Sequence, residues 1–190
     1  LGSPAPVING LTDLEHPCQI LADLLTLQEL GKLKAGNTLA YVGDCDNNVA
    51  HSLMVGCAMA GLDISLIGPK EAEPSEEYME AARNFGADVS FSSSASGLSH
   101  ADVVYTDTWV SMGDEHEAAS RLALFAPYQV RAELMAYAKP DAVFMHCLPA
   151  HRGEEVSADV LDGSQSVVFQ QASNRLHAQK GLLMWLSRQK

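Results

Sequence analysis

Cysteine and basic residues are scarce in this sequence, and their scarcity excludes several kinds of protein. The four cysteines show no C-x-x-C pairing and no regular spacing; they are Cys18, Cys45, Cys57 and Cys147. This pattern argues against a disulfide framework or a structural zinc site, and it fits a reducing cytoplasm. Lysine and arginine number 12 against 24 aspartates and glutamates, giving a formal net charge of −12, and the basic residues are scattered. A nucleic-acid or anionic-membrane surface is therefore disfavoured, and we expect a small-molecule partner.

Long apolar runs are also missing. No run approaches the roughly 20 residues that a helix needs to cross a bilayer, and the chain does not open with a basic stretch followed by an apolar one. With 190 residues and 47% hydrophobic content, the chain is long enough to bury one substantial core, so we expect one main domain. Residues 1–15 begin with LGSPAP and are interpreted as a linker or a cloning remnant outside that domain.

From residue 16 onward, short apolar runs alternate with longer helical patterns. The apolar runs predict buried strands at 38–44, 63–68, 87–91, 102–107 and 142–149, and a further short strand at 166–169. The helical patterns predict helices at 16–33, 47–60, 75–85 and 95–100, and a closing amphipathic helix at 173–189. Strands separated by helices indicate right-handed βαβ units. We therefore expect an α/β fold, a doubly wound and Rossmann-like parallel sheet of about five strands with helices on both faces.

Three polar clusters each follow a predicted strand. They read GDCDNN at 43–48, TDTWVSMGDE at 106–115 and HCLPAHRG at 146–153. Ligands in open parallel sheets bind beyond the carboxyl ends of the strands. The sequence therefore predicts that all three clusters face one crevice.

The segment 146–155 contains two histidines, a thiol, an arginine and two carboxylates within ten positions. A metal site is disfavoured there, because Pro149 interrupts any helix that could bring His146 and His151 to one face, and zinc ligands usually show tighter, repeated spacing. Two other interpretations stay open, one structural and one functional.

In the structural interpretation the segment is a strand end and a turn, closed by a pair between Arg152 and either Glu154 or Glu155. In the functional interpretation Cys147 lies at a strand end where backbone N–H groups and nearby arginines favour its thiolate. Asp107 lies at the matching end of another strand. A carboxylate and a thiolate that meet there would suit a cationic amine, first by binding it and then by taking its proton.

Other polar residues also have two interpretations. The asparagines at 47–48 are a natural helix start, or they hold the carboxylate or amine of a ligand. The SMG stretch at 111–113 is a flexible loop or a lid. The helix start HPCQ could bind an anion or a polarised carbonyl oxygen with its free N–H groups, helped by His16 and Gln19. Arg175 is a solvated residue or a guanidinium held over an anionic substrate.

Five motifs in a fixed order resemble the ornithine carbamoyltransferases, which transfer a carbamoyl group from carbamoyl phosphate to the δ-amine of ornithine and release citrulline and phosphate. The motifs are NGLTDLEHPCQILADLLTLQE, GDCDNNVAHSL, DTWVSMGDE, HCLPAHRGEEV and NRLHAQKGLL, within residues 7–186. Each motif is moderately specific alone. Together they make a chance match very unlikely.

The resemblance implies roles for individual residues. It gives catalytic roles to Asp107, Cys147, His16 and Arg175, ornithine binding to Asn48, Asp107, Ser111 and Met112, and carbamoyl phosphate binding to His16, Gln19, Cys147, Leu148 and Arg175. In this scheme His16 and Gln19 contact the carbamoyl group and polarise its carbonyl. No cofactor or metal ion is expected, because phosphate is already a good leaving group, and positioning of the two substrates should dominate catalysis.

The resemblance also implies how the chain is organised. Residues 16–31 would form a helix between domains, 32–172 the ornithine-binding domain, and 173–190 a closing helix that packs toward an N-terminal carbamoyl-phosphate domain. The Ser-Thr-Arg-Thr-Arg phosphate-binding loop of the family does not occur in this sequence, so we expect this chain alone to be inactive without that domain. The acidic residue that the family pattern places before Asn174 is also absent, which leaves the pairing of Arg175 open.

Alternative functions stay open. The chain could be an isolated amino-acid-binding domain without catalysis, or a related transcarbamoylase for another amine, although HPCQ and SMG favour ornithine. A nucleotide-binding Rossmann domain is excluded because GDCDNN is not G-x-G-x-x-G. Association into a homo-oligomer is left open, and neither nucleic acid nor a membrane is expected as a partner.

Overall fold

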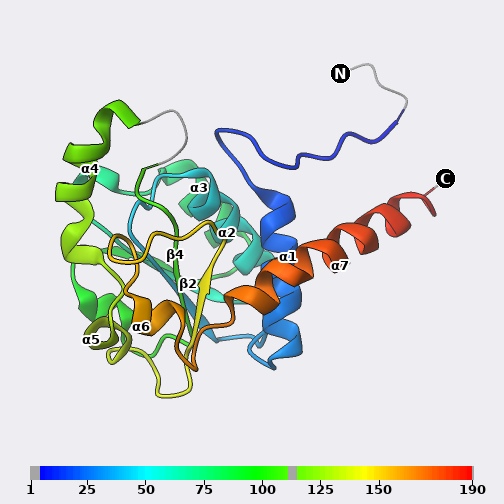
Figure 1. Ribbon diagram of the computed structural model, residues 1–190. Helices are drawn as coiled ribbons and strands as arrows, with labels where there is room; N and C mark the ends of the chain where they lie inside the picture. The colour runs from blue at the N-terminus through cyan, green and yellow to red at the C-terminus, as the bar shows by residue number, and fades with distance from the viewer. Residues whose placement is uncertain (1–4, 111–114, 190) are drawn as a thin grey trace.

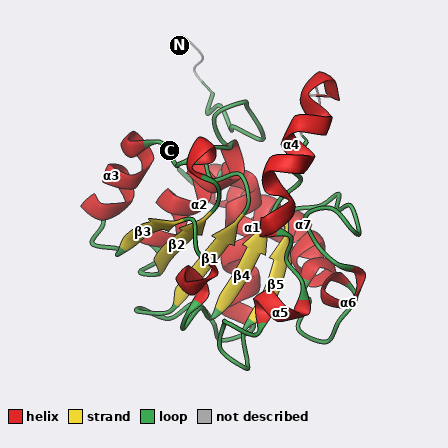
Figure 2. Ribbon diagram, turned by 90° about the vertical axis from the view of Figure 1, so that its left-hand side faces the viewer, coloured by secondary structure: helices red, strands yellow, loops and turns green. Residues whose placement is uncertain are grey.

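In the part of the chain that the structure describes, residues 5–110 and 115–189 of a computed structural model, a five-stranded parallel sheet forms the centre of the molecule. The strands are β1 Thr38–Val42, β2 Asp63–Ile67, β3 Val89–Ser92, β4 Val103–Thr106 and β5 Val143–His146. They lie in the order β3-β2-β1-β4-β5, and every neighbouring pair is parallel (Figure 2). The expected α/β sheet is confirmed.

Helices cover both faces of this sheet (Figure 1). They are α1 Pro17–Glu29, α2 Asn48–Met59, α3 Glu76–Asn84, α4 Ala118–Phe125, α5 Ala132–Met135, α6 Ala158–Leu161 and α7 Val168–Leu186, with short 3-10 turns at Lys70–Ala72, Ala95–Leu98, Glu115–Glu117 and Ala126–Tyr128. Side chains of α1, α2 and α3 pack on one face, and those of α5 and α6 pack on the other. This arrangement is the doubly wound architecture that the sequence predicts.

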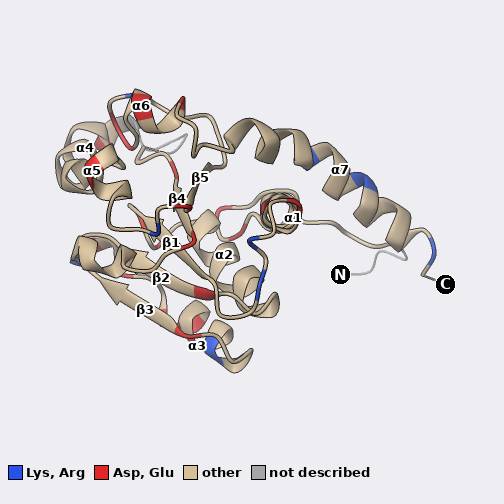
Figure 3. Cartoon of the chain, turned by 90° about the horizontal axis from the view of Figure 1, so that it is seen from below, with Lys and Arg blue, Asp and Glu red and all other residues tan. Residues whose placement is uncertain are grey.

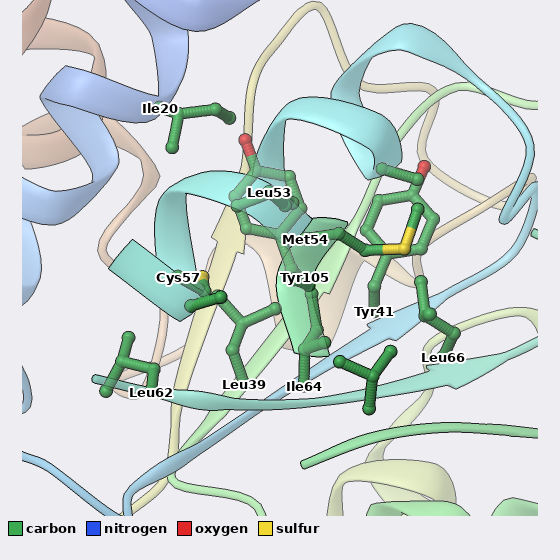
Figure 4. Packing of buried hydrophobic residues seen from close by; sticks show 14 of the residues in the cluster. Ile20, Leu39, Tyr41, Leu53, Met54, Cys57, Leu62, Ile64, Leu66 and Tyr105 are labelled. Atoms are coloured by element: carbon green, nitrogen blue, oxygen red, sulfur yellow. The ribbon is translucent and has the colours of Figure 1, made fainter. Parts of the chain in front are cut away.

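The two faces of β1 belong to different parts of the core. Leu39 and Tyr41 pack with α2, whereas Ala40 and Val42 pack on the opposite face. Because successive strand residues point to opposite faces and both faces are covered, the strand is apolar along its length. Figure 4 shows Leu53 of α2 in the same cluster as Leu39 and Tyr41 of β1.

The expected strand at 166–169 is wrong. Ser166 forms a single parallel bridge with Phe144, and Val167 donates its backbone N–H to the Phe144 carbonyl at 3.0 Å. Val168 is then the first residue of α7, which therefore starts before the predicted residue 173. The β-branched pair suggests a strand, but the chain leaves the edge of β5 after one bridge. Helices α4, α5 and α6 were also not expected.

The strand order reverses at β1. The chain runs from β1 outward through β2 and β3, and then returns to place β4 and β5 on the other side of β1. Ligands bind in the crevice that such a reversal leaves at the carboxyl ends of the two adjacent strands. Gly43, directly after β1, has φ +126°, and a Cβ there would lie 3.3 Å from Nε1 of Trp109, so the backbone closely approaches the segment after β4.

Helix α7 packs against α1 over its first half and then runs away from the body of the molecule (Figures 1 and 3). Leu176, Leu183 and Trp185 are 60%, 57% and 59% exposed, while Leu182 and Leu186 are half-buried. The outer half of this helix therefore presents an incompletely covered apolar set. Packing of that set toward another domain stays a prediction.

The few lysines and arginines lie scattered over α3, α7 and the loops, without forming a stripe (Figure 3). None of the helices in the described ranges has the length and apolar character needed to span a membrane.

Candidate active site

Asp107 and Cys147 meet at the reversal point of the sheet. Asp107 follows β4 and Cys147 follows β5, and the thiol of Cys147 donates a hydrogen bond to Oδ1 of Asp107 at 2.9 Å. The same oxygen accepts from the backbone N–H of Thr108 at 2.7 Å. The carboxylate and the thiol, which the sequence places at the ends of two different strands, are therefore in direct contact.

The expectation that the surroundings favour a Cys147 thiolate is wrong. Burial and the facing Asp107 carboxylate raise the pKa of the Cys147 thiol well above its usual value. The charged group that faces the thiol is the Asp107 carboxylate, and not an arginine that would stabilise a thiolate. Cys147 is therefore a neutral hydrogen-bond donor at physiological pH.

His16 precedes the first turn of α1 and lies within electrostatic range of Arg175 and Asp107. Burial and the positive charge of Arg175 lower the pKa of His16. Its Nδ1 lies 2.9 Å from the carbonyl oxygen of Gly10, which can only accept, so the proton of the neutral ring is on Nδ1. The free Nε2 of this tautomer accepts a hydrogen bond. Donation to a carbonyl oxygen, which the polarising role requires, would need the charged ring that this environment disfavours.

Gln19 and Arg175 lie together where α1 and α7 pack. The Nη1 of Arg175 donates to Oε1 of Gln19 at 2.6 Å, which settles the pairing that the sequence left open. Within the described chain, the Nε of Arg175 is buried without a hydrogen-bond partner. One guanidinium donor is therefore paired with a buried amide, and another has no hydrogen-bond partner among the described residues.

A buried carboxylate that sequence reasoning missed organises this region. Asp23 is fully buried on α1, and its Oδ1 accepts from Nε2 of Gln19 at 2.9 Å and from Nε2 of Gln171 at 2.8 Å. Its Oδ2 accepts from the hydroxyl of Tyr105 at 3.1 Å. Burial raises the pKa of Asp23 to about 6, and these three hydrogen bonds act against the increase. One carboxylate therefore connects α1, β4 and α7.

The two asparagines after β1 have different roles. Asn47 caps α2, accepting the Ala50 backbone N–H at 2.8 Å. Asn48 donates from Nδ2 to the carbonyl of Thr12 at 2.8 Å. Asn48, an expected ornithine ligand, is half-buried and holds the segment before α1 in place. The other two expected ornithine ligands, Ser111 and Met112, lie outside the described residues.

Leu148 occupies an unusual backbone conformation directly after Cys147. Its φ of +59° lies in the left-handed region, its peptide bond to Pro149 is cis, and its backbone N–H donates to Nδ1 of His146 at 2.9 Å. The strand end is therefore followed by a sharp turn, as the proline in the sequence indicates.

The loop clamp predicted within 146–155 is wrong. Arg152 pairs with Asp162, through contacts of 2.9 Å and 2.8 Å, and not with either glutamate of the loop. Glu155 is fully buried instead, with its Oε1 3.2 Å from Nε2 of His146 and its Oε2 3.7 Å from Nδ1 of His151. Both histidines therefore approach one carboxylate, although Pro149 separates them.

Two groups of side chains in this region have atoms close enough to hold a metal ion. They are Asp107 with His146 and Cys147, and His151 with Glu154 and Glu155. The first group fits a hydrogen-bonded arrangement without an ion, because its thiol donates to the carboxylate and its imidazole Nδ1 accepts a backbone N–H.

Arg121 is a second residue that sequence reasoning missed. From α4 it donates to Oδ2 of Asp44 and to the carbonyl of Trp109, both at 2.5 Å. It thereby joins the segments that follow β1 and β4. No spacing in the sequence indicates that this arginine reaches back to the crevice.

Known protein families and solved structures match most of this chain. A family model described as the aspartate/ornithine carbamoyltransferase Asp/Orn binding domain matches residues 35–186. The chain belongs to the aspartate/ornithine carbamoyltransferase family. The model of the family's carbamoyl-P binding domain matches residues 1–29, which include the stretch that the sequence analysis leaves out of the fold.

Individual family members are similar over nearly the whole chain. Ornithine carbamoyltransferase of Bacillus subtilis is 57% identical over 184 residues, which are 94% of this chain and 57% of that protein. The enzyme of Corynebacterium diphtheriae is 53% identical, over 95% of this chain and 60% of the other. The structure of ornithine carbamoyltransferase from Pyrococcus furiosus matches with a TM-score of 0.88 at 48% identity, over 95% of this chain and 59% of that one. The chain thus spans about three fifths of the length of these relatives.

Proposed function

We propose that this chain carries the amino-acid half of an ornithine carbamoyltransferase. The reaction transfers the carbamoyl group of carbamoyl phosphate to the δ-amine of L-ornithine and releases L-citrulline and phosphate. The contact between Asp107 and Cys147 at the reversal point of the sheet is the observation that carries this proposal. The names of the relatives support the choice of substrates.

Asp107 would receive the cationic amine. The δ-amine of ornithine is mostly protonated at neutral pH, so it must be bound and must lose a proton before it attacks. The carboxylate offers the charge for binding, while the neutral thiol of Cys147, which donates a hydrogen bond to that carboxylate, lies beside it as a polarizable group. The nitrogen–carbon bond then forms, and the bond between the carbonyl carbon and the phosphate oxygen breaks. Of the two protons that the nitrogen loses, one goes to the departing phosphate and the other to water.

The remaining candidate residues divide between the two substrates. Asn48, Ser111 and Met112 would hold ornithine with Asp107. His16, Gln19, Cys147, Leu148 and Arg175 would contact carbamoyl phosphate, whose negative charge the Arg175 guanidinium would balance. With Nε2 as an acceptor, His16 suits the carbamoyl NH2 group better than the carbonyl oxygen. The reaction requires no cofactor or metal, because phosphate is already a leaving group.

The proposal includes a domain arrangement and a location. Residues 16–31 connect two domains, 32–172 bind ornithine, and 173–190 pack toward a carbamoyl-phosphate domain, which is the partner that the chain needs for turnover. The match of residues 1–29 to the model of that domain supports this division. The four free thiols support a cytoplasmic location.

Two measurements test the proposed function. Isothermal calorimetry should detect binding of L-ornithine, and weaker binding of L-aspartate, to the purified chain. A citrulline assay at high protein concentration should detect product when a carbamoyl-phosphate domain from a relative is added. Ornithine binding without citrulline in the presence of that domain would favour the alternative, an amino-acid-binding domain without catalysis. Preference for a different amine would favour a related transcarbamoylase.

A further inference from the structure

His146 and Glu155 form a buried pair that the proposed reaction does not use directly. Both side chains have an exposed fraction of 0%. His146 is the last residue of β5, and Glu155 lies where the loop after β5 returns to the body of the molecule. Burial of a carboxylate against an imidazole is costly unless their hydrogen bonds compensate for the lost water. We therefore ask which group of the molecule this buried pair keeps in position.

The hydrogen bonds determine which ring nitrogen of His146 carries the proton. The backbone N–H of Leu148 donates to Nδ1 at 2.9 Å, so Nδ1 must present a lone pair. The proton of the neutral ring is then on Nε2, which faces Oε1 of Glu155 at 3.2 Å. A carboxylate stabilises this tautomer because it can only accept. Glu155 is itself held by the backbone N–H of His151, which donates to Oε1 at 2.5 Å.

The group that His146 holds is the backbone of Leu148 in a conformation that leucine rarely adopts. With φ at +59°, Leu148 lies in the left-handed region, which residues with a Cβ atom rarely adopt. The hydrogen bond from its N–H to the His146 ring spans Cys147 and opposes relaxation of the turn. This backbone conformation orients the Cys147 thiol toward Oδ1 of Asp107, 2.9 Å away.

We propose that His146 and Glu155 are positioning residues for the amino-acid site. Glu155 keeps the proton of His146 on Nε2, the Nδ1 lone pair holds Leu148 in its left-handed conformation, and that conformation places Cys147 against Asp107. The inference rests on the proposed function only in placing Cys147 and Leu148 where the two substrates meet, beside the ornithine ligand Asp107. His146 Nε2 and Glu155 Oε2 are buried and have no hydrogen-bond partner in the described chain, so Glu155 acts on His146 through its charge at 3.2 Å, an arrangement that is unfavourable for stability alone.

Paired substitutions separate positioning from simple packing. His146→Asn keeps an acceptor at the position of Nδ1, whereas His146→Gln reaches toward Glu155 and leaves the Leu148 N–H without its partner. Glu155→Gln keeps an acceptor for Nε2–H, and Glu155→Leu removes it. Arg152→Gln is the control, because it breaks the exposed pair with Asp162 on the same loop.

Three readouts are compared: the tautomer of His146 by heteronuclear NMR, the alkylation rate of Cys147 by peptide mapping, and ornithine affinity by calorimetry. We expect the proton on Nε2 in the wild-type chain. In His146→Gln and Glu155→Leu, Cys147 moves away from Asp107, so alkylation should accelerate and ornithine affinity should fall, each about tenfold for the loss of one such hydrogen bond. His146→Asn, Glu155→Gln and the control should stay within about twofold of wild type.

A proton on Nδ1 of wild-type His146, or equal effects of His146→Asn and His146→Gln, would overturn the proposal. The tautomer and the alkylation rates need no ligand. They therefore decide the positioning role even if the wild-type chain binds no ornithine, a result that would count against the proposed function alone. If His146→Gln does not fold, the wild-type tautomer and the comparison of Glu155→Leu with Glu155→Gln still decide.

Discussion

The carboxylate of Asp107 is the charged group that the cationic amine of ornithine would meet in the crevice. A charge-assisted hydrogen bond is worth roughly 1.5–3 kcal/mol. We expect Asp107→Asn to weaken ornithine binding by about one to two orders of magnitude, as measured by isothermal calorimetry. The control is Asp141→Asn, which removes an exposed carboxylate paired with Lys32 far from the site. Equal ornithine affinity in wild type and Asp107→Asn would exclude this role.

The same substitution should change the chemistry of Cys147. The Asp107 carboxylate contributes to the raised pKa of the thiol and accepts its hydrogen bond at 2.9 Å. Asp107→Asn should lower that pKa, increase the thiolate fraction and accelerate alkylation by iodoacetamide at about pH 8. Cys57, which is fully buried, is the internal reference for labelling in the same sample. Slower labelling of Cys147 in the variant would show that access, and not charge, controls this thiol.

Asp23 should make stability depend on pH. Its folded-state pKa of about 6 lies above the value of about 3.9 for an unfolded aspartate. The stabilisation by the bound proton is fully present below about pH 4 and is lost as pH rises through about 6, a loss of order 3 kcal/mol. Asp23→Asn carries no such proton. Urea unfolding from about pH 4.5 to about pH 7.5 should therefore show wild type losing stability relative to the variant, and parallel curves would contradict this.

Helices α1 and α7 are joined by a polar contact that is buried between them. Asn174 donates from Nδ2 to Oγ1 of Thr26 at 3.0 Å and to Oε2 of Glu29 at 2.8 Å. Asn174 is only 4% exposed, so when its side chain is truncated, water cannot fully replace it as the hydrogen-bond partner of Thr26 and Glu29. Asn174→Ala should lower the free energy of unfolding by about 1–3 kcal/mol. Lys180→Ala, at an exposed position of the same helix, should have almost no effect in the same urea titration.

At the level of elements, the sequence predicts what depends on local patterns. The strand cores and the start of α1 at Pro17 could be predicted because apolar runs and a proline in the first turn act locally. Val168 was wrongly assigned to a strand because β-branched residues favour strands, while the end of the edge pairing at Ser166 depends on tertiary structure. Element type was therefore recoverable where no distant contact competes.

The candidate site was predictable only where topology places residues. The clusters that contain Asp107 and Cys147 could be expected to face one crevice, because parallel strands end at the same edge of a sheet, but the contact between the two side chains could not. The sign of the effect on Cys147 was not predictable, since it depends on which charge faces the thiol at 2.9 Å. Asp23 and Glu155 gave no signal either, because the sequence does not show that a single acidic residue is buried.

For the whole molecule, the outer half of α7 is an exposed apolar surface. Leu183 and Trp185 are 57% and 59% exposed, and such patches favour association. We expect the 190-residue chain to self-associate with rising concentration in sedimentation velocity experiments. Leu183→Gln with Trp185→Gln should reduce the association, and Arg188→Gln is the control at an exposed polar position just past the end of the helix. Unchanged sedimentation of the double variant would place the contact elsewhere.

In the proposed function, this chain supplies only part of the carbamoyl phosphate site. A doubly charged phosphate needs several donors as charge moves onto it in the transition state, and Arg175 offers only part of them. This chain contains no Ser-Thr-Arg-Thr-Arg loop, so we expect weak carbamoyl phosphate binding and little citrulline formation by the chain alone. Co-expression with the carbamoyl-phosphate domain of a relative should restore citrulline formation and cover the apolar face of α7. The control is the same co-expression with Arg175→Ala, which should keep the two domains associated and lose turnover. Robust turnover by the 190-residue chain alone would show that the loop is dispensable and that the residues of this half suffice for the reaction.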